Sequence, residues 1–441
     1  MNNQQPKIQR PPTSGEAGDI IARDASLMSR SYRRAFPIVV KRVHGALVED
    51  INDNSYIDFT SGLRTLPIGG NHPEVVKALR SQLEKVASYN LMAAYSEEPV
   101  ELVEELSRIA PIRGDVRALF CSSGSEAIDA AIRSMRWHSG KNVILTFLGE
   151  YHGSTITCLT ASTDERARRT STRILDIIYS LRHDCEVCPI GSDPKECKAE
   201  CLKLSRDLIK SVAPEDLSAI LFEPIHFRMG LSFPPADYFE KLRVLAKELG
   251  GLTIANELIT SPARTGRWFA LDHWNAKVDA VCLGEQLASG LPLGILLARE
   301  ELLDLKPGMH ELTAGLQLST VAALTTLRVI REEGLVERSE RLGRRVLKRL
   351  RDHIEDLGLG WRIGGVGLLT GIGVLGEDGL GDERLAKLIV DECFRVGLLL
   401  ERRGATLILS PALNIEEEIL EKGLEIFEEK VAELSQLSQA S

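Results

Sequence analysis

The sequence predicts an α/β protein with a mainly parallel sheet in a large domain and a smaller α+β domain. Three observations lead to this prediction. Short apolar runs alternate with helix-like segments through the middle of the chain, and the pattern becomes mostly helical after residue 316. Apolar strands separated by helices are typical of a parallel sheet covered on both faces. A chain of 441 residues is also long enough for one large and one smaller domain.

The expected strands of the large domain are short and apolar, and helical segments separate them. The runs are 116–121, 142–148, 217–225, 251–259, 280–284 and 294–300. Residues 125–140 and 237–250 have the apolar spacing of helices that pack one face against a sheet. In the last part of the chain, a long helical segment breaks at Gly334, and further helices are expected near 382–396 and 416–434.

Composition and charge exclude several classes of protein. The chain is 44% hydrophobic and 27% charged, with a formal net charge of -9, which is ordinary for a globular protein and argues against a nucleic-acid binder. No apolar run approaches the roughly 20 residues that span a bilayer. The polar N-terminus lacks the apolar core of a secretory signal. We therefore expect a cytoplasmic protein without membrane contact, whose N-terminal arm is mobile or lies across a partner.

The eight cysteines fall into two groups. Four of them, Cys121, Cys158, Cys282 and Cys393, lie in apolar contexts and are expected to be small buried hydrophobes. The other four, Cys185, Cys188, Cys197 and Cys201, cluster in "CEVCPIGSDPKECKAEC". Four thiolates with two- and three-residue spacers can bind zinc. We prefer free or disulfide-paired cysteines and assign no metal site, and the redox or metal state of this group stays open.

Two stretches have the residue types of a ligand site. In "ALFCSSGSEAIDAAIR", serines and a glycine stand between a strand and a helix, where free N–H groups bind anions and small residues let a phosphate approach. The same residues are also ordinary helix caps. In "GEYHGST", Tyr151 and His152 follow the next strand, and an aromatic face there can stack on a planar ligand. An unspecialised surface pair is the alternative for these two residues.

These stretches, taken in order, resemble the class III aminotransferases of archaeal type, a pyridoxal-phosphate family that includes ornithine and 4-aminobutyrate aminotransferases. The matching stretches run from about residue 50 to 330: "YIDFTSGLRTLPIGGNHPEVVKAL", "SSGSEAIDAAIR", "EYHGST", "FEPI", "PPADYFEKLRVLAKELGGLTIANELITSPARTGR", "LGEQLASGLPLG" and "LTAGLQLSTVAAL". The resemblance implies the type I aminotransferase fold and dimers whose active sites lie between subunits. The cysteine cluster resembles an insertion seen in archaeal members.

The resemblance also implies domain boundaries and site residues. Residues 1–65 would form an N-terminal arm and part of the small domain, residues 66–315 the large pyridoxal-phosphate-binding domain, and residues 316–441 the C-terminal small domain. Five residues match family positions that hold the cofactor or line its site. They are Gly124 and Ser125 of the phosphate turn, the stacking Tyr151, Glu223 of the Glu-Pro turn, and Thr313, which would reach the other subunit's phosphate.

The departures from the family pattern fall on positions that perform chemistry. Counting back five residues from Gly290, the position of the Schiff-base lysine holds Glu285, and the nearest lysines are Lys277 and Lys306. A carboxylate cannot condense with an aldehyde, and it cannot replace the lysine amine in moving a proton between substrate and cofactor carbon. The sequence therefore lacks the residue that the family's reaction requires.

Three further positions differ. Asn256 stands where the family has an aspartate that keeps the pyridine nitrogen protonated, and an amide offers no such charge. Ile259 replaces a glutamine near the ring hydroxyl. Ile408 replaces the arginine that binds the substrate carboxylate. The changes thus affect cofactor attachment, ring charge and substrate binding.

We therefore predict a class III aminotransferase homologue that has lost transaminase activity and has no assigned catalytic residue. The candidate cofactor-binding residues are Gly124, Ser125, Tyr151, Glu223, Asn256, Glu285 and Thr313, and pyridoxal phosphate is expected to be held non-covalently at most, or to be absent. The preferred role is the non-catalytic subunit of a hetero-oligomer with an active relative; a homo-oligomer and a small-molecule ligand also stay open. The alternatives are an enzyme that uses Glu285 as an acid or base, and a functional aminotransferase for amino or omega-amino acids in which an unidentified residue substitutes.

Overall fold

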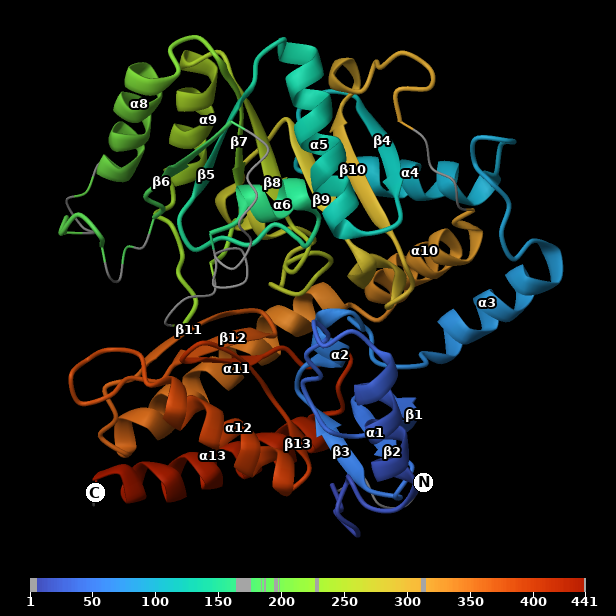
Figure 1. Cartoon of the computed structure of the whole chain (residues 1–441), viewed down its shortest axis with the longest axis vertical. Helices are drawn as coiled ribbons and strands as arrows, with labels where there is room; N and C mark the ends of the chain where they lie inside the picture. The colour runs from blue at the N-terminus through green and yellow to red at the C-terminus, as the bar shows by residue number, and fades with distance from the viewer. Residues whose placement is uncertain are drawn as a thin grey trace.

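The computed structural model confirms the α/β class. It describes residues 6–163, 176–183, 185, 188–193, 197, 199–226, 230–310 and 315–439. A seven-stranded sheet and its helices fill the upper half of Figure 1, and two four-stranded sheets with the C-terminal helices fill the lower half. Within the described residues, no helix combines the length and the apolar character that a membrane span requires.

The seven-stranded sheet has the order β4-β10-β9-β8-β7-β5-β6. Its strands are β4 (Val116–Cys121), β5 (Val143–Phe147), β6 (Ile177–Ser180), β7 (Leu217–Phe222), β8 (Leu252–Asn256), β9 (Ala280–Leu283) and β10 (Gly294–Arg299). The pairs from β9 through β8, β7 and β5 to β6 are parallel, whereas β10 is antiparallel to both β4 and β9. The short connection from β9 to β10 explains this reversal, because a parallel crossover needs a dozen or more residues.

Helices cover both faces of this sheet. They are α4 (Glu97–Ile109), α5 (Gly124–Ser139), α6 (Ile156–Ala161), α8 (Glu200–Val212) and α9 (Tyr238–Glu248). Helix α5 begins directly after β4, and its N-cap Ser123 accepts a hydrogen bond from the Glu126 backbone N–H. It ends at Gly140 in the left-handed conformation, with φ at 67°. The sheet therefore fixes the position of the α5 N-terminus.

The two ends of the chain meet in the lower half of the molecule. Strands β1 (Val40–His44), β2 (Leu47–Asp50) and β3 (Ser55–Asp58) share a sheet with β13 (Leu398–Leu399), which pairs in parallel with β3. The third sheet has the order β11 (Arg362–Val366), β12 (Leu369–Gly373), β15 (Thr406–Leu409) and β14 (Glu401–Arg403). The other α-helices in the described residues are α1 (Glu16–Leu27), α2 (Ser61–Arg64), α3 (Pro73–Lys85), α10 (Gln317–Glu332), α11 (Leu335–Asp356), α12 (Glu383–Arg395) and α13 (Glu417–Gln439). The expected helix break at Gly334 separates α10 from α11.

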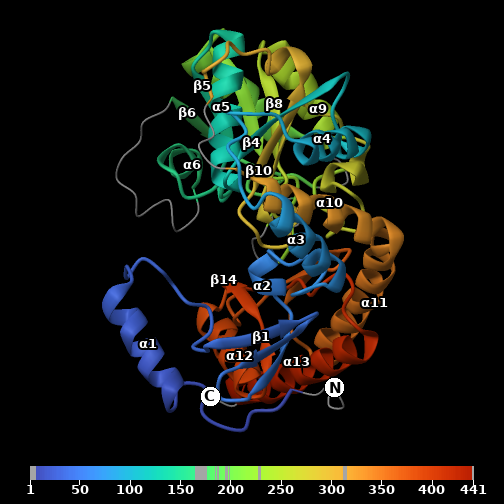
Figure 2. The same ribbon diagram turned by 90° about the vertical axis from the view of Figure 1, so that its right-hand side faces the viewer.

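The beginning of the N-terminal arm is fixed to the body of the protein. Lys7 pairs with Ser55, and the Asn54 side-chain oxygen accepts hydrogen bonds from the backbone N–H groups of Gln9 and Arg10 at 2.7 and 3.0 Å. Residues 7–10 therefore lie along β3 of their own chain. The sequence had led us to expect an arm that is mobile or that lies across a partner. Helix α1 stands to one side of the small sheets in Figure 2.

A buried arginine joins three distant segments. Arg264 follows β8, is fully buried, and donates hydrogen bonds to the carbonyl of Pro411, the carbonyl of Leu368 at 3.2 Å and Ser61 Oγ at 3.1 Å. Burial lowers the pKa of its guanidinium to about 9, and nearby Asp58 acts in the opposite direction. The large sheet is thereby tied to both the N-terminal and the C-terminal segments.

Candidate functional site

The predicted site residues meet at one edge of the large sheet. Tyr151 follows β5, Glu223 follows β7, Asn256 ends β8 and Glu285 follows β9, and these four strands are consecutive neighbours in the sheet. Gly124 begins α5, directly after β4. Carboxyl ends of parallel strands lie at a common edge, which is where α/β proteins bind ligands.

Hydrogen bonds connect three of these residues. The Tyr151 backbone N–H donates to Glu223 Oε2 at 3.3 Å, and Asn256 Nδ2 donates to the Tyr151 carbonyl at 3.3 Å. The side chains of Glu223 and Asn256 are buried. The structure therefore brings Tyr151, Glu223 and Asn256 together, as the sequence predicted for residues of one site.

The amide of Asn256 is also bonded to a buried histidine. Asn256 Nδ2 lies 3.1 Å from His152 Nδ1, and because the amide can only donate there, His152 Nδ1 is the acceptor. His152 Nε2 then donates to Thr146 Oγ1 at 2.9 Å, and Asn256 Oδ1 accepts from the Leu258 backbone N–H at 3.2 Å. Both ends of the Asn256 amide are therefore engaged in hydrogen bonds.

Two buried carboxyl groups, those of Glu150 and Glu223, lie next to these hydrogen-bonded residues. The Glu223 backbone N–H donates to Glu150 Oε1 at 3.1 Å, and Glu150 Oε2 lies 3.4 Å from His152 Nε2. Burial raises the pKa of Glu150 to about 8, and burial together with the charge of Glu150 raises the pKa of Glu223 to about 7. Sequence reasoning missed Glu150, and its place beside Tyr151 and His152 is the only signal that could have drawn attention to it.

The α5 N-terminus offers two unused backbone donors. The Ser122 N–H donates to Glu126 Oε2 at 2.6 Å and the Glu126 N–H donates to Ser123 Oγ at 3.2 Å, whereas no partner among the described residues accepts from the N–H groups of Gly124 and Ser125. Free N–H groups at a helix N-terminus bind phosphate. This arrangement fits the predicted anion site.

Leu258 joins this turn to the turn that carries Glu285. A Cβ at Gly124 would lie 2.6 Å from Leu258 Cδ2, and a Cβ at Gly284 would lie 3.2 Å from the same atom. Glycine at both positions lets the leucine pack directly against the backbone of both turns. The Gln286 amide then donates to the Leu258 carbonyl at 2.8 Å.

Glu285 begins the short 3-10 helix η2 (Glu285–Ala288) and is exposed, while the next three residues are buried. Glu285 thus lies at the same edge of the sheet as Tyr151, Glu223 and Asn256, with its side chain open to solvent in the single chain. Lys277 lies before the other end of β9, where its Nζ donates to the Ala110 carbonyl at 3.4 Å. Lys306 is exposed in the loop after β10. Lys277 is thus held at the opposite end of β9 from Glu285.

Ile408 and Ile259 belong to one apolar cluster. Its buried members are Ile225, Leu231, Ala270, Leu369 and Ile408, with Phe233, Ile259, Trp274 and Val366 packed against them. Ile408 lies on β15 and is fully buried. Opposite it on the neighbouring strand β14 is Glu401, which forms an ion pair with Arg64. In the family pattern, position 408 holds the arginine that binds the substrate carboxylate, and position 259 holds the glutamine near the ring hydroxyl. Here both positions contribute to an apolar contact between β15 and the segment after β8.

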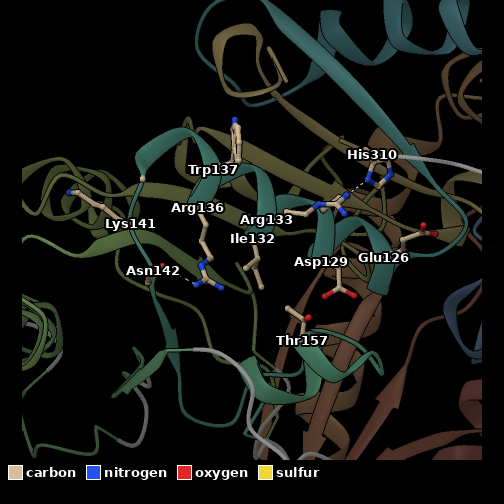
Figure 3. Close-up of a pocket in the computed structure, with 12 residues that line it drawn as sticks. Glu126, Asp129, Ile132, Arg133, Arg136, Trp137, Lys141, Asn142, Thr157 and His310 are labelled. Atoms are coloured by element: carbon tan, nitrogen blue, oxygen red, sulfur yellow. Dashed lines mark hydrogen bonds between the residues drawn. The ribbon is translucent and has the colours of Figure 1, made fainter. Parts of the chain in front are cut away.

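The predicted Thr313 lies outside the described residues. Sequence reasoning did not predict a hollow of about 860 Å³ beside α5, which His310 helps to line (Figure 3). Cys121, Glu126 and His310 bring potential ligand atoms within 4.8 Å of one another at one end of it. Arg133 hydrogen-bonds His310 Nδ1, so a cation there would meet a guanidinium. We assign no metal to this group.

Comparisons with known proteins are consistent over nearly the whole chain. Residues 27–431 match the family described as aminotransferase class-III. The leucine/methionine racemase of Thermococcus litoralis is 31% identical over 95% of this chain and 96% of its own. The acetylornithine aminotransferase of Archaeoglobus fulgidus is 31% identical over 92% and 99%. The solved structure of a Bacillus anthracis aminotransferase is 26% identical, with a TM-score of 0.86 over 96% of this chain and 99% of that one.

Proposed function

Because the chain belongs to the class III aminotransferase family, we propose that it is a member without transaminase activity that serves as the non-catalytic subunit of a hetero-oligomer with an active relative. The observation that carries this proposal is Glu285 at the position of the Schiff-base lysine, with Lys277 engaged elsewhere. A primary amine attaches the cofactor as an imine in this type of chemistry, and a carboxylate cannot form that bond.

The residues of the site fit pyridoxal phosphate only in part. The cofactor supplies an electron sink when its ring nitrogen is protonated. The N–H groups of Gly124 and Ser125 suit its phosphate, but Glu285 cannot attach it, and the Asn256 amide offers no charge to the ring nitrogen. We therefore expect at most non-covalent binding, held by the α5 N-terminus and Tyr151.

The apolar cluster around Ile408 supports the same conclusion for the substrate. A carboxylate-binding arginine forms paired, charge-assisted hydrogen bonds that an isoleucine cannot make. Glu401 lies opposite Ile408 in the sheet, and it already forms an ion pair with Arg64. An amino acid substrate would thus meet apolar side chains where the family binds its carboxylate.

An exposed apolar segment supports assembly with another subunit. From the last turn of α3 to the first turn of α4, six apolar side chains are exposed, Tyr95 completely: Leu83, Val86, Tyr89, Met92, Tyr95 and Val100. The Gln317 side chain fixes this segment by bonding both backbone groups of Tyr89 at 2.8 Å and Ser96 Oγ at 2.9 Å. Apolar side chains gathered on an ordered surface commonly mark a protein interface. His310 lies three residues before Thr313, the residue that would reach a partner's phosphate site.

An enzyme with changed chemistry is the second candidate, and the buried acids favour it. Glu150 and Glu223 have pKa values raised to about 8 and about 7, in the range that suits a general acid or base. They would serve this role better than Glu285, which is exposed. One similar protein is named a racemase, so the family includes names other than aminotransferase. Such an activity would have to proceed without covalent attachment of the cofactor.

The subunit proposal is tested by sedimentation of the purified chain, alone and mixed with an intact class III relative from the same organism. We expect the mixture to form a species larger than either chain, and Tyr95→Glu to abolish it. Leu380→Glu is the matched control, because Leu380 is also exposed but lies far from this segment in sequence. A chain that stays monomeric at micromolar concentration with and without the relative would contradict the proposal.

A further inference from the structure

Two arginines share one carboxylate beside the candidate site. Glu401 Oε2 accepts a hydrogen bond from Arg64, and the other oxygen, Oε1, lies 3.8 Å from Arg403 Nε. The side chain of Arg64 is 9% exposed, that of Glu401 15% and that of Arg403 22%. Two cations and one anion are therefore held together in a largely buried group, and such a group favours a further negative charge.

Strand β14 presents Glu401 and Arg403 on one face. Side chains alternate along a strand, so Arg402 lies on the opposite face. Ile408 is directly opposite Glu401 on β15, and residues that are opposite each other point to the same side of a sheet. Ile408 packs in the apolar cluster that includes Ile259, which follows β8. The face that carries Glu401 and Arg403 is therefore the one turned toward the large sheet.

A strained turn holds Arg64 in this group. All four residues of Ser61–Arg64 have positive φ, and φ is 71° at Arg64. Residues other than glycine are rare in this region and keep such a conformation only where their surroundings fix it. Asp58 fixes the turn, because its carboxylate accepts from the Gly62 N–H at 2.8 Å and from Thr60 Oγ1 at 2.7 Å. The backbone of Arg64 is thus fixed independently of Glu401.

The Arg64 turn lies against the turn that follows Glu285. A Cβ at Gly290 would lie 3.2 Å from Leu66 Cδ2 and 3.6 Å from Thr65 Oγ1, so the two turns are in close contact. Figures 1 and 2 both show α2 between the small sheets and the large sheet. The two arginines therefore border the candidate site.

Glu223 compensates the charge of Arg403 only in part. Burial and the charge of Glu150 raise the pKa of Glu223 to about 7, against the opposing charges of His152 and Arg403. Near neutral pH this carboxyl group is therefore ionised in about half of the molecules. Glu401 remains the carboxylate that both arginines share.

We propose that Arg64 and Arg403 form a carboxylate-binding subsite that Glu401 occupies from within, and that a ligand carboxylate binds there by displacing Glu401. Strand β14 is at the edge of its sheet and the Glu401 side chain is partly exposed, so this side chain can turn outward without breaking the sheet. Guanidinium groups bind a ligand carboxylate through the same charge-assisted hydrogen bonds.

The surroundings define the class of ligand. The apolar cluster that contains Ile408 and the half-buried Ile259 and Phe233 lies on the same face as the two arginines and suits an apolar chain. The ligand class is therefore a small organic acid with an apolar body. Such binding does not supply the amine that is missing at Glu285, so this inference goes beyond the proposed function and does not depend on it.

The test is the affinity of the full-length protein for 4-methylpentanoate, measured by isothermal titration calorimetry. Glu401→Gln removes the internal carboxylate and should bind the acid about tenfold more tightly than wild type, as expected for one charge-assisted hydrogen bond. Adding Arg64→Gln or Arg403→Gln to this variant should reverse the gain. The neutral 4-methylpentanamide should bind more weakly than the acid to Glu401→Gln.

Arg402→Gln in the Glu401→Gln background is the matched control. Arg402 is on the opposite face of β14, where it donates to the Gly404 carbonyl at 2.8 Å and lies 3.9 Å from Glu383. We expect this change to leave the affinity for the acid unaltered. Thermal unfolding shows that each variant is folded, and the gain in Glu401→Gln cannot result from misfolding.

Titration of Glu401→Gln with L-leucine and with 4-methyl-2-oxopentanoate distinguishes an amino acid from an oxo acid as the source of the carboxylate, and tighter binding of either supports the subsite. The proposal is overturned if Glu401→Gln binds 4-methylpentanoate no more tightly than wild type, or binds the acid and the amide equally. Equal losses on changing Arg402 and Arg64 would also overturn it, because they would show a general effect of charge.

Discussion

Two contacts between the large sheet and the C-terminal strands differ in chemistry. Arg264 keeps a buried guanidinium and bonds it to Ser61 and to the carbonyls of Leu368 and Pro411. Three residues before Pro411, Ile408 fills the family position of a substrate-binding arginine with an apolar side chain. A buried charge is thus present where it connects segments and absent where it would bind a substrate. The contact that joins the segments of the fold is thus kept at Arg264, whereas Ile408 departs from the family pattern.

The largest effect is expected at the retained charge. Replacing Arg264 by alanine leaves buried carbonyl groups without donors and opens a cavity, so we expect a loss of about 3–5 kcal/mol in the free energy of unfolding. Arg345→Ala is the control, since its ion pairs with Glu417 and Glu421 are exposed and should contribute at most about 1 kcal/mol. Urea denaturation measures both variants. Equal losses would show that Arg264 is not the connecting residue.

A second variant tests the lost charge directly. Ile408→Arg restores the family residue but buries a guanidinium among Ile225, Leu231 and Leu369. We expect a destabilisation of roughly 2–4 kcal/mol, because a buried charge without a partner is costly. Ile408→Leu should cost less than about 1.5 kcal/mol. If the arginine variant is as stable as wild type and binds carboxylates, position 408 is accessible to ligands and is not part of a closed apolar contact.

The retained phosphate turn is tested at Gly124. A Cβ there would lie 2.6 Å from Leu258 Cδ2, so Gly124→Ala must displace the leucine and alter the turn. We expect a loss of about 1–3 kcal/mol in stability and weaker non-covalent binding of pyridoxal phosphate. Gly360→Ala meets no atom within 4 Å and should leave binding unchanged. Isothermal titration calorimetry with the cofactor gives the comparison, and unchanged affinity in Gly124→Ala would place the phosphate elsewhere.

A graded, pH-dependent effect is expected from the buried acid Glu150. The folded-state pKa of Glu150, about 8, lies above the ordinary value of 4.5, so the native state holds a proton that the unfolded state has released. This contribution to stability is therefore complete below about pH 4.5 and is lost as the pH rises to 8. The slope for one proton is ~1.4 kcal/mol per pH unit. Glu150→Gln should flatten the profile between pH 5 and 8, whereas an unchanged profile would show that Glu150 is ionised in the native protein.

The sequence was sufficient for the fold and for much of the site. Strand and helix patterns located β4, β5, β7, β8, β9 and β10 within a few residues, and order along a sheet edge brought Tyr151, Glu223 and Asn256 together. The Glu150–His152–Asn256 contacts could not be predicted, because they depend on how side chains turn inside a buried edge. The placement of Ile259 and Ile408 in one apolar cluster likewise joins residues far apart in the sequence, which no local pattern contains.

The central claim is that no lysine of this chain attaches pyridoxal phosphate, and borohydride trapping tests it most directly. Wild-type protein, Glu285→Gln and Glu285→Lys are incubated with the cofactor and reduced, and the peptides are mapped by mass spectrometry. We expect no phosphopyridoxyl-lysine at the sheet edge in wild type or Glu285→Gln, and near-complete labelling of residue 285 in Glu285→Lys, accompanied by aldimine absorbance. A reduced adduct of the wild-type protein, mapped to a lysine that reaches this site, would contradict the account.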